Sequence, residues 1–325
     1  MADKHTGLVI SSAPHVNNPV DTTSIMRDVI IALIPSLAVS VYVMGIRALL
    51  LTVVCVAACV IFEWAWQKFM HRPQTIGDLS AAVTGVILAF NLPVNLPFWM
   101  AVVGCFIAII ITKQLFGGLG QNFANPAIVA RVAMFVGFAS AMTSWKVTSH
   151  MDPAIVAAAG DAMTGATPLG LLTKGAELPS YMSMFLGTIN GSMGEVSAVA
   201  LIVGGIYLLV RKVITWEIPV SFIVSVAVFS LLMGRDPIFD VLAGGVMLGA
   251  IFMATDYVTS PINPAGKIIF GIGCGLMTML IRQFGAYPEG VSFAILLMNV
   301  LTPHIDDWTR SKLNGVEPQK KGGAK

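Results

Sequence analysis

Apolar residues in this chain occur in ten long stretches separated by shorter polar segments. Most stretches contain no charged residue and are continuously apolar, which is typical of helices that cross a membrane. A full crossing needs about 20 residues. The third, eighth and tenth stretches are shorter, so we expect polar ends to extend them, or breaks where they line a cavity. The stretches are residues 25–43, 48–66, 79–92, 98–112, 126–142, 196–210, 218–233, 241–253, 268–281 and 291–301.

Composition agrees with this pattern. The 325 residues are 56% hydrophobic and 11% charged, with a mean hydropathy of +0.82, whereas a soluble domain has about 25% charged residues. The sequence therefore predicts an all-α polytopic membrane protein with about ten transmembrane helices. Residues 1–24 are polar and lack the apolar region of a cleavable signal peptide. The net charge of +2 gives no indication of nucleic-acid binding.

The distribution of lysine and arginine predicts the orientation, because these residues favour the cytoplasmic side. With a cytoplasmic N-terminus and ten alternating spans, 14 of the 19 Lys and Arg residues fall in the cytoplasm and 5 outside. This orientation places residues 143–193 outside and both termini inside.

The two halves of the chain share an internal repeat. Each half contributes five spans, and because five is odd, the second copy crosses the membrane upside down, as in many transport folds. We expect five-helix repeats at residues 1–142 and 194–309, an extracytoplasmic loop at 143–193 and a basic cytoplasmic tail at 310–325. The repeat consists of Gly104-Cys105, Lys113-Gln114 and Phe116-Gly117, which recur as Gly273-Cys274, Arg282-Gln283 and Phe284-Gly285.

Few reactive side chains lie within the apolar stretches. Arg131 lies about two turns into the fifth stretch, and an ionisable residue at that depth is a functional candidate. Glu63 and Lys113 lie near cytoplasmic ends, where long side chains reach the interface. No series of acidic residues crosses the bilayer centre, so we expect no proton pumping by this chain alone. Cys55 and Cys59 lie one helical turn apart but lack further ligands, so we expect small buried residues and no metal.

The long polar loop contains a stretch rich in small residues and hydroxyls, Asp161-Ala162-Met163-Thr164-Gly165-Ala166-Thr167-Pro168-Leu169. One interpretation is a helix start, with Thr167 as N-cap and Pro168 in the first helical position. The other is a covalent attachment site at the Thr167 hydroxyl, because Gly165 and Ala166 leave room for a bulky group.

Two polar turns precede spans in the two halves. The cytoplasmic turn contains Asn122 and Asn125, whose amides suit a ring system with both donors and acceptors. Asp256 ends the eighth stretch on the same side. Alternatively, these residues cap helices and let them pack. The turns are Gly120-Gln121-Asn122-Phe123-Ala124-Asn125-Pro126 and Gly285-Ala286-Tyr287-Pro288-Glu289-Gly290.

Three motifs resemble those of one membrane-protein family, and the resemblance covers nearly the whole chain, from the first stretch to the tenth. This family contains RnfD, a membrane protein of the Rnf complex, and NqrB, its relative in the Na⁺-translocating NADH:quinone reductase. The segment Thr164-Gly165-Ala166-Thr167 is similar to its flavinylation motif, Ser/Thr-Gly-Ala-Thr, with Thr in the first position. The other motifs are Gly120-Gln121-Asn122-Phe123-Ala124-Asn125-Pro126-Ala127 and Tyr287-Pro288-Glu289-Gly290-Val291-Ser292-Phe293-Ala294.

The resemblance implies an electron-transfer subunit of an Rnf complex, an ion-translocating ferredoxin:NAD⁺ oxidoreductase of the bacterial inner (cytoplasmic) membrane. It implies FMN attached to Thr167 through a phosphoester on the outer side, installed by a separate flavin transferase. It also implies a second, non-covalent flavin, riboflavin, with Asn122, Asn125 and Asp256 as candidate contacts. The surroundings expected for the outer flavin are Thr164, Gly165, Ala166, Pro168, Tyr287, Glu289 and Gly290.

The implied partners are the other Rnf complex subunits (A, B, C, E and G), together with membrane lipid. The resemblance implies no direct binding of ferredoxin or NAD⁺ and no catalytic side chain. Two other functions remain open: a solute channel or transporter of the inverted-repeat, urea-transporter-like type, and a structural scaffold. In-gel fluorescence separates these functions, because only a covalent flavin remains with the protein after denaturation.

Overall fold

The computed structural model describes residues 21–310, except positions 149, 154, 157–163, 166, 176 and 286–288. The regular secondary structure of this part of the chain is helical apart from one antiparallel pair of short strands, β1 (Trp145–Lys146) and β2 (Thr164–Gly165). The all-α class is therefore confirmed. Three helices are long and apolar enough to cross a membrane, and five further apolar helices have 10–17 residues. The long ones are α1 (Thr22–Met44), α2 (Ile46–Phe69) and α14 (Pro264–Phe284).

All ten predicted stretches form helices. In the first half, α1 and α2 are followed by η1 (Ile76–Asp78), α3 (Ser80–Phe90), α4 (Phe98–Phe106), the π-helical η2 (Ile107–Gln114), α5 (Pro126–Gly137) and α6 (Ala139–Met142). The connecting segment contains α8 (Pro168–Lys174), α9 (Tyr181–Leu186) and η3 (Met193–Glu195). The second half contains α10 (Ala198–Val210), α11 (Glu217–Leu232), α12 (Pro237–Leu242), α13 (Val246–Leu248), the π-helical η4 (Gly249–Met253), α14 and α15 (Val291–Thr309).

Two predicted spans are interrupted. The fifth is divided at Phe138, which has non-helical backbone angles between α5 and α6. The eighth is divided at Gly244 and Gly245, which both have positive φ and separate α12 from α13. Glycine adopts this conformation without a steric penalty, so the sequence itself explains the second break.

Polar residues determine where several helices begin. The side chains of Asp21, Asn125, Ser197 and Asp236 accept hydrogen bonds from backbone N–H groups in the first turns of α1, α5, α10 and α12. These N–H groups have no partner within the helix, so a polar side chain at the N-cap stabilises the helix start.

Glycines allow neighbouring helices to pack closely. A methyl group at Gly204 of α10 would lie 2.2 Å from the carbonyl oxygen of Ala32 in α1, and one at Gly85 of α3 would lie 2.7 Å from Cα of Val56 in α2. Small residues have this role in membrane bundles, where van der Waals packing replaces the hydrophobic effect between helices.

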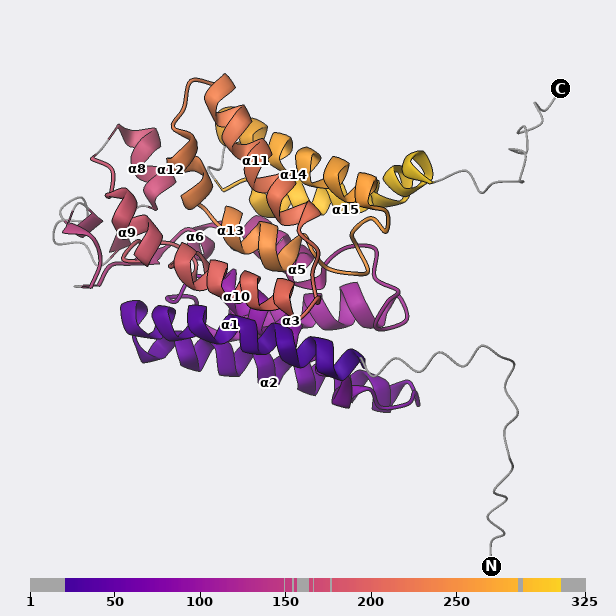
Figure 1. The fold of residues 1–325 in the computed structure, drawn as a ribbon. Helices are drawn as coiled ribbons and strands as arrows, with labels where there is room; N and C mark the ends of the chain where they lie inside the picture. The colour runs from indigo at the N-terminus through magenta and orange to yellow at the C-terminus, as the bar shows by residue number, and fades with distance from the viewer. Residues whose placement is uncertain are drawn as a thin grey trace, which may run out of the picture.

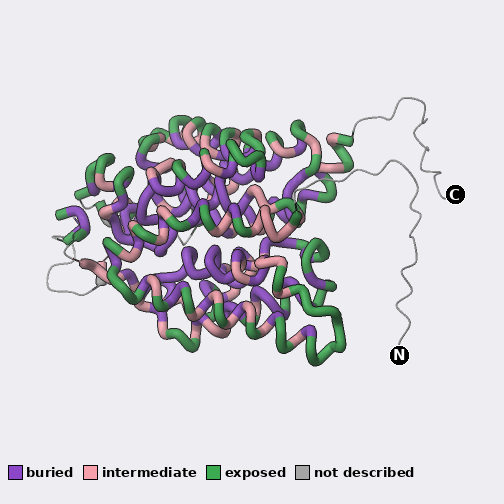
Figure 2. Tube along the Cα trace, turned by 60° about the horizontal axis from the view of Figure 1, so that its bottom comes forward, coloured by how far each residue is buried: buried purple, intermediate pink, exposed green. Residues whose placement is uncertain are grey.

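The helices form an elongated bundle whose interior is buried along its length (Figures 1 and 2). Helix α1 begins, and α15 ends, at the same end of the bundle (Figure 1, right). Helices α8 and α9 lie at the opposite end (Figure 1, left). We call these the terminal end and the loop end. The predicted loop therefore lies at the other end of the bundle from the beginning of α1 and the end of α15.

The two halves share a packing scheme. Helix α2 packs on α3 and α4, and α11 packs on α12 and α14, while the halves meet through α1 with α10 and α5 with α15. In each half, the basic residue of the repeated motif donates a hydrogen bond to a residue at, or just before, the beginning of the third span of that half. Lys113 donates to Oγ of Ser80 at 2.6 Å, and Arg282 donates to the backbone oxygen of Asp240 at 2.6 Å.

The two basic residues lie at opposite ends of the bundle. Lys113 lines a cavity together with Ile25 in the first turn of α1, whereas Arg282 lies beside Gly244, which packs on Leu169 of α8. An inverted repeat requires this arrangement, although the superposition of the two halves stays a prediction.

We expect Gly204→Ala to destabilise the protein by about 1–3 kcal/mol, because the added methyl group would overlap the backbone of α1. Thermal unfolding in detergent measures the effect. Gly137→Ala in α5 is the matched control, since no atom lies within 4 Å of its new methyl group, and we expect no loss of stability there. Equal melting temperatures for the two variants would contradict close packing of α1 and α10.

Candidate functional site

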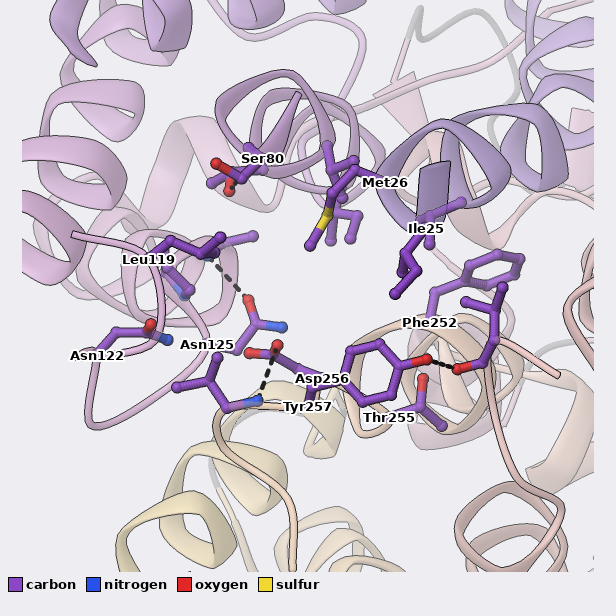
Figure 3. Close-up of a pocket in the computed structure, with 18 of the residues that line it drawn as sticks. Ile25, Met26, Ser80, Leu119, Asn122, Asn125, Phe252, Thr255, Asp256 and Tyr257 are labelled. Carbon is purple, nitrogen blue, oxygen red and sulfur yellow. Dashed lines mark hydrogen bonds between the residues drawn. The ribbon is translucent and has the colours of Figure 1, made fainter. Parts of the chain in front are cut away.

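A cavity of about 100 Å³ lies at the terminal end of the bundle. It brings together Asn122, Asn125 and Asp256, the three residues that the sequence singled out on that side (Figure 3). Its walls come from both halves of the chain. Further lining residues are Ile25, Met26, Val29, Ser80, Val83, Thr84, Ile87, Lys113, Leu119, Leu208, Ile214, Phe252, Thr255 and Tyr257.

The amides in this cavity have structural roles as well. Asn125 caps α5, accepting from the N–H of Ala127 at 3.0 Å, and donates to the backbone oxygen of Met253 at 3.3 Å. Asn122 donates to the backbone oxygen of Ala124 at 3.0 Å. The capping interpretation is therefore correct for Asn125, and a ligand-binding role for either amide is compatible with its place in the cavity wall.

Asp256 is the acidic group of the cavity. Its carboxylate accepts from the Thr259 hydroxyl at 3.0 Å, which holds the turn after η4. Burial raises the pKa of the Asp256 carboxyl, and the hydrogen bond from Thr259 acts in the opposite direction. The group can therefore accept a hydrogen bond as a carboxylate or donate one when it is protonated.

Sequence reasoning missed the role of Lys113 in this cavity. It placed Lys113 and Glu63 near the interface, but the structure buries both, with Lys113 2% exposed and Glu63 fully buried. The Lys113 ammonium donates to both Glu63 oxygens, at 3.0 and 3.1 Å, and to Ser80. The two charges lie 50 positions apart in the sequence, so no local pattern indicated that they form a pair.

At the loop end, Thr167 caps α8, as the first interpretation of the motif expected. Its hydroxyl accepts from the N–H of Gly170 at 3.2 Å, and Pro168 occupies the first helical turn. Thr167 is 6% exposed, and Leu169 fills the space beside Gly244. The motif therefore packs against the break between α12 and α13.

The remaining motif residues are placed as follows. Thr164 and Gly165 form β2, which pairs with Lys146 and Trp145 of β1. Gly290 precedes α15 and accepts from the N–H of Ala294 at 3.0 Å. Ala166 and Tyr287 lie outside the described residues.

Arg131 joins four elements in the bundle interior. One terminal nitrogen donates to Glu289 at 2.7 Å and to Glu195 at 3.2 Å, and the other donates to Asn91 at 2.6 Å. All four residues are buried. They come from α5, the end of α3, η3 and the segment before α15, so Arg131 connects the first half to the second.

The sequence identified Arg131 as unusual but missed its counter-ions. Glu195 directly precedes the sixth apolar stretch and was not singled out, whereas Glu289 lies in the outer turn and was expected beside the outer flavin. The structure places its carboxylate on Arg131. Each glutamate precedes a span by only a few residues, and a buried guanidinium requires such partners.

A second buried charge cluster lies beside α12. Asp240 accepts from Arg235 at 2.8 Å, through both carboxylate oxygens, and from Ser230 at 2.7 Å. Arg282 also bonds the backbone oxygens of Ala243 and Gly244, at 2.7 and 3.3 Å. The guanidinium of Arg282 thus holds the break on which the Thr167 segment packs.

Comparison with known proteins adds to this geometry. The model of the NQR2, RnfD, RnfE family matches residues 9–315. The D subunit of the Na⁺-translocating ferredoxin:NAD⁺ oxidoreductase complex of Acetobacterium woodii is 49% identical over 97% of each chain. The D subunit of the proton-translocating complex of Clostridium ljungdahlii is 43% identical, over 93% of this chain and 94% of the relative. The D subunit of the ion-translocating oxidoreductase complex of Halorhodospira halophila is 36% identical over 94% of each.

Proposed function

The chain belongs to the NQR2, RnfD, RnfE family, and we propose that it serves as the flavin-carrying RnfD component of an ion-translocating ferredoxin:NAD⁺ oxidoreductase complex. The observation that carries this proposal is the 49% identity, over 97% of the chain, to the corresponding protein of such a complex. The other Rnf complex subunits (A, B, C, E and G) are then its partners, in the cytoplasmic membrane of a bacterium.

Within this role, the proposed acceptor of FMN is the hydroxyl of Thr167. The motif supports this assignment, and so does the place of Thr167 at the start of α8, where the N–H of Gly170 faces its oxygen. An oxygen esterified to phosphate still accepts a hydrogen bond, and the phosphate keeps one negative charge. A helix start suits such a charge, although Pro168 contributes no N–H group.

Burial restricts how the attachment takes place. Because Thr167 is 6% exposed and Leu169 packs on Gly244, a separate flavin transferase cannot reach the hydroxyl in this arrangement. We therefore propose that modification precedes docking of this segment, or that the segment moves away from the bundle to be modified.

FMN supplies one- and two-electron transfer when it is bound. The chain contributes a fixed position at the loop end, a covalent link that prevents loss of the cofactor, and buried charges behind the attachment point. The excess of Lys and Arg on the other side supports placing the loop end outside the cytoplasm.

The cavity at the terminal end is the proposed site of a second, non-covalent flavin, riboflavin. The amides of Asn122 and Asn125 and the carboxyl of Asp256 supply the donors and acceptors that an isoalloxazine ring requires. Pockets for ligands of this size usually measure about 300–1,000 Å³, so a cavity of about 100 Å³ must enlarge to admit the ring.

We expect Thr167→Asn to remove covalent FMN while the helix cap remains, because asparagine caps helices but has no hydroxyl. Mass spectrometry of the peptide spanning residues 161–174 should lose one increment of FMN minus water, and in-gel fluorescence should disappear. Thr167→Ala should behave in the same way, whereas Thr164→Ser should retain both signals. Fluorescence that persists in denatured Thr167→Asn protein would exclude Thr167 as the acceptor.

We expect a cysteine at Glu177, in the exposed loop after α8, to react with a membrane-impermeant maleimide in intact protoplasts. A cysteine at Gln74, after α2, should react only after lysis, because it lies at the terminal end. The four native cysteines are fully buried and should give no background. The reverse labelling pattern would overturn the proposed orientation.

We expect gently purified Thr167→Ala protein to release riboflavin on acid extraction. Asn122→Ala should lower the amount released, because it removes an amide from the cavity wall. Asn95→Ala, in the segment between α3 and α4 and outside the cavity wall, should leave the amount unchanged. If the Thr167→Ala protein contains no flavin, the second site is wrong, although the assignment of Thr167 stands.

A further inference from the structure

Two cavities lie next to each other at the terminal end. The second measures about 200 Å³ and shares Ile214, Thr255 and Tyr257 with the first. It extends beneath the turn between α10 and α11 toward Lys267 of α14. Because the two cavities share three lining residues, a movement of one of these side chains could join them.

Of the three shared residues, the one with the largest side chain is Tyr257. Its hydroxyl donates to the backbone oxygen of Val213, so the ring bridges the turn after η4 and the turn after α10 (Figure 3). Tyr257 is 55% exposed, so few packing contacts hold the ring. A neutral hydrogen bond contributes little net stability, and this bridge can therefore open without disturbing either turn.

We propose that Tyr257 is a movable partition, and that opening it joins the two cavities into one elongated site for a flavin. This inference rests on the proposed second flavin and names how that ligand is held. The ring system lies among Asn122, Asn125 and Asp256, with the Tyr257 ring free to stack on it. The tail extends into the second cavity.

The chemistry of the second cavity indicates what kind of tail fits. The Lys267 ammonium donates to the Thr215 hydroxyl at 3.0 Å, and the Glu217 carboxylate is close enough to interact with it electrostatically. The charge of Lys267 is thus partly balanced. With that charge balanced, the cavity gives the phosphate of FMN little net attraction, whereas the Thr215 hydroxyl in its wall can bond the neutral, hydroxyl-rich tail of riboflavin.

The first test measures how large a molecule the first cavity admits, and it uses no flavin. Thr84→Cys places a thiol in the wall of the first cavity, and its rate of reaction with a flavin-sized maleimide is divided by its rate with N-ethylmaleimide. Tyr257→Phe removes only the hydroxyl, and we expect it to raise this ratio by roughly two- to ten-fold. Tyr207→Phe is the matched control, because the Tyr207 hydroxyl donates to Asp28 at 3.1 Å and neither residue lines the cavity. This variant should leave the ratio unchanged. An unchanged ratio in Tyr257→Phe would overturn the partition.

The second test titrates riboflavin and FMN into flavin-free Thr167→Ala protein and follows quenching of flavin fluorescence. Tyr257→Phe should bind riboflavin faster and more tightly, whereas Tyr257→Ala, which has no ring to stack, should bind it more weakly. Tighter binding of FMN than of riboflavin would overturn the neutral tail. If the maleimide ratio responds and neither flavin binds, the partition is upheld and the proposed second flavin fails.

Discussion

A charge inside a membrane protein is stable only with a partner, because an unpaired ion in a low dielectric costs several kcal/mol. This requirement organises the structure around Arg131. Its guanidinium holds Glu195 and Glu289, which lie far apart in the sequence, and Asn91 at the end of α3. Removing the guanidinium would leave two buried carboxylates together, so the position of both segments depends on it.

The same requirement applies to backbone groups where helices end inside the bundle. Both α3 and η4 stop in the interior, and their ends meet, with the Asn91 amide 3.5 Å from the sulfur of Met253. The backbone oxygen of Met253 accepts from Asn125. The Asn91 amide donates to the backbone oxygen of Ile87 and accepts from the guanidinium of Arg131. A carbonyl without such a donor is costly away from water. Asparagine and arginine therefore make the interrupted helices possible.

Patterns within one segment made much of the fold predictable from sequence. Ten apolar stretches became helices, and the N-cap at Thr167 and the break at Gly244 follow from local chemistry. The cluster of Asn122, Asn125 and Asp256 was predictable because alternation of the spans puts the turn before the fifth stretch and the end of the eighth on the same side of the membrane. The partners of Arg131 and Lys113 were not, since ion pairs between distant segments depend on tertiary packing that has no local signature. Tyr257 was missed for the same reason, because only the folded chain brings it to Val213.

The packing of the centre bears on which function suits this architecture. Between the two ends, the described chain is filled by large, fully buried side chains, including Phe90, Phe222 and Phe270, and by the Arg131 network. A solute pathway would require these groups to move apart and would expose paired charges. Electron transfer requires no open path, only cofactors held in fixed places. A bundle closed in the middle therefore suits the proposed holding of one cofactor at each end better than the passage of a solute.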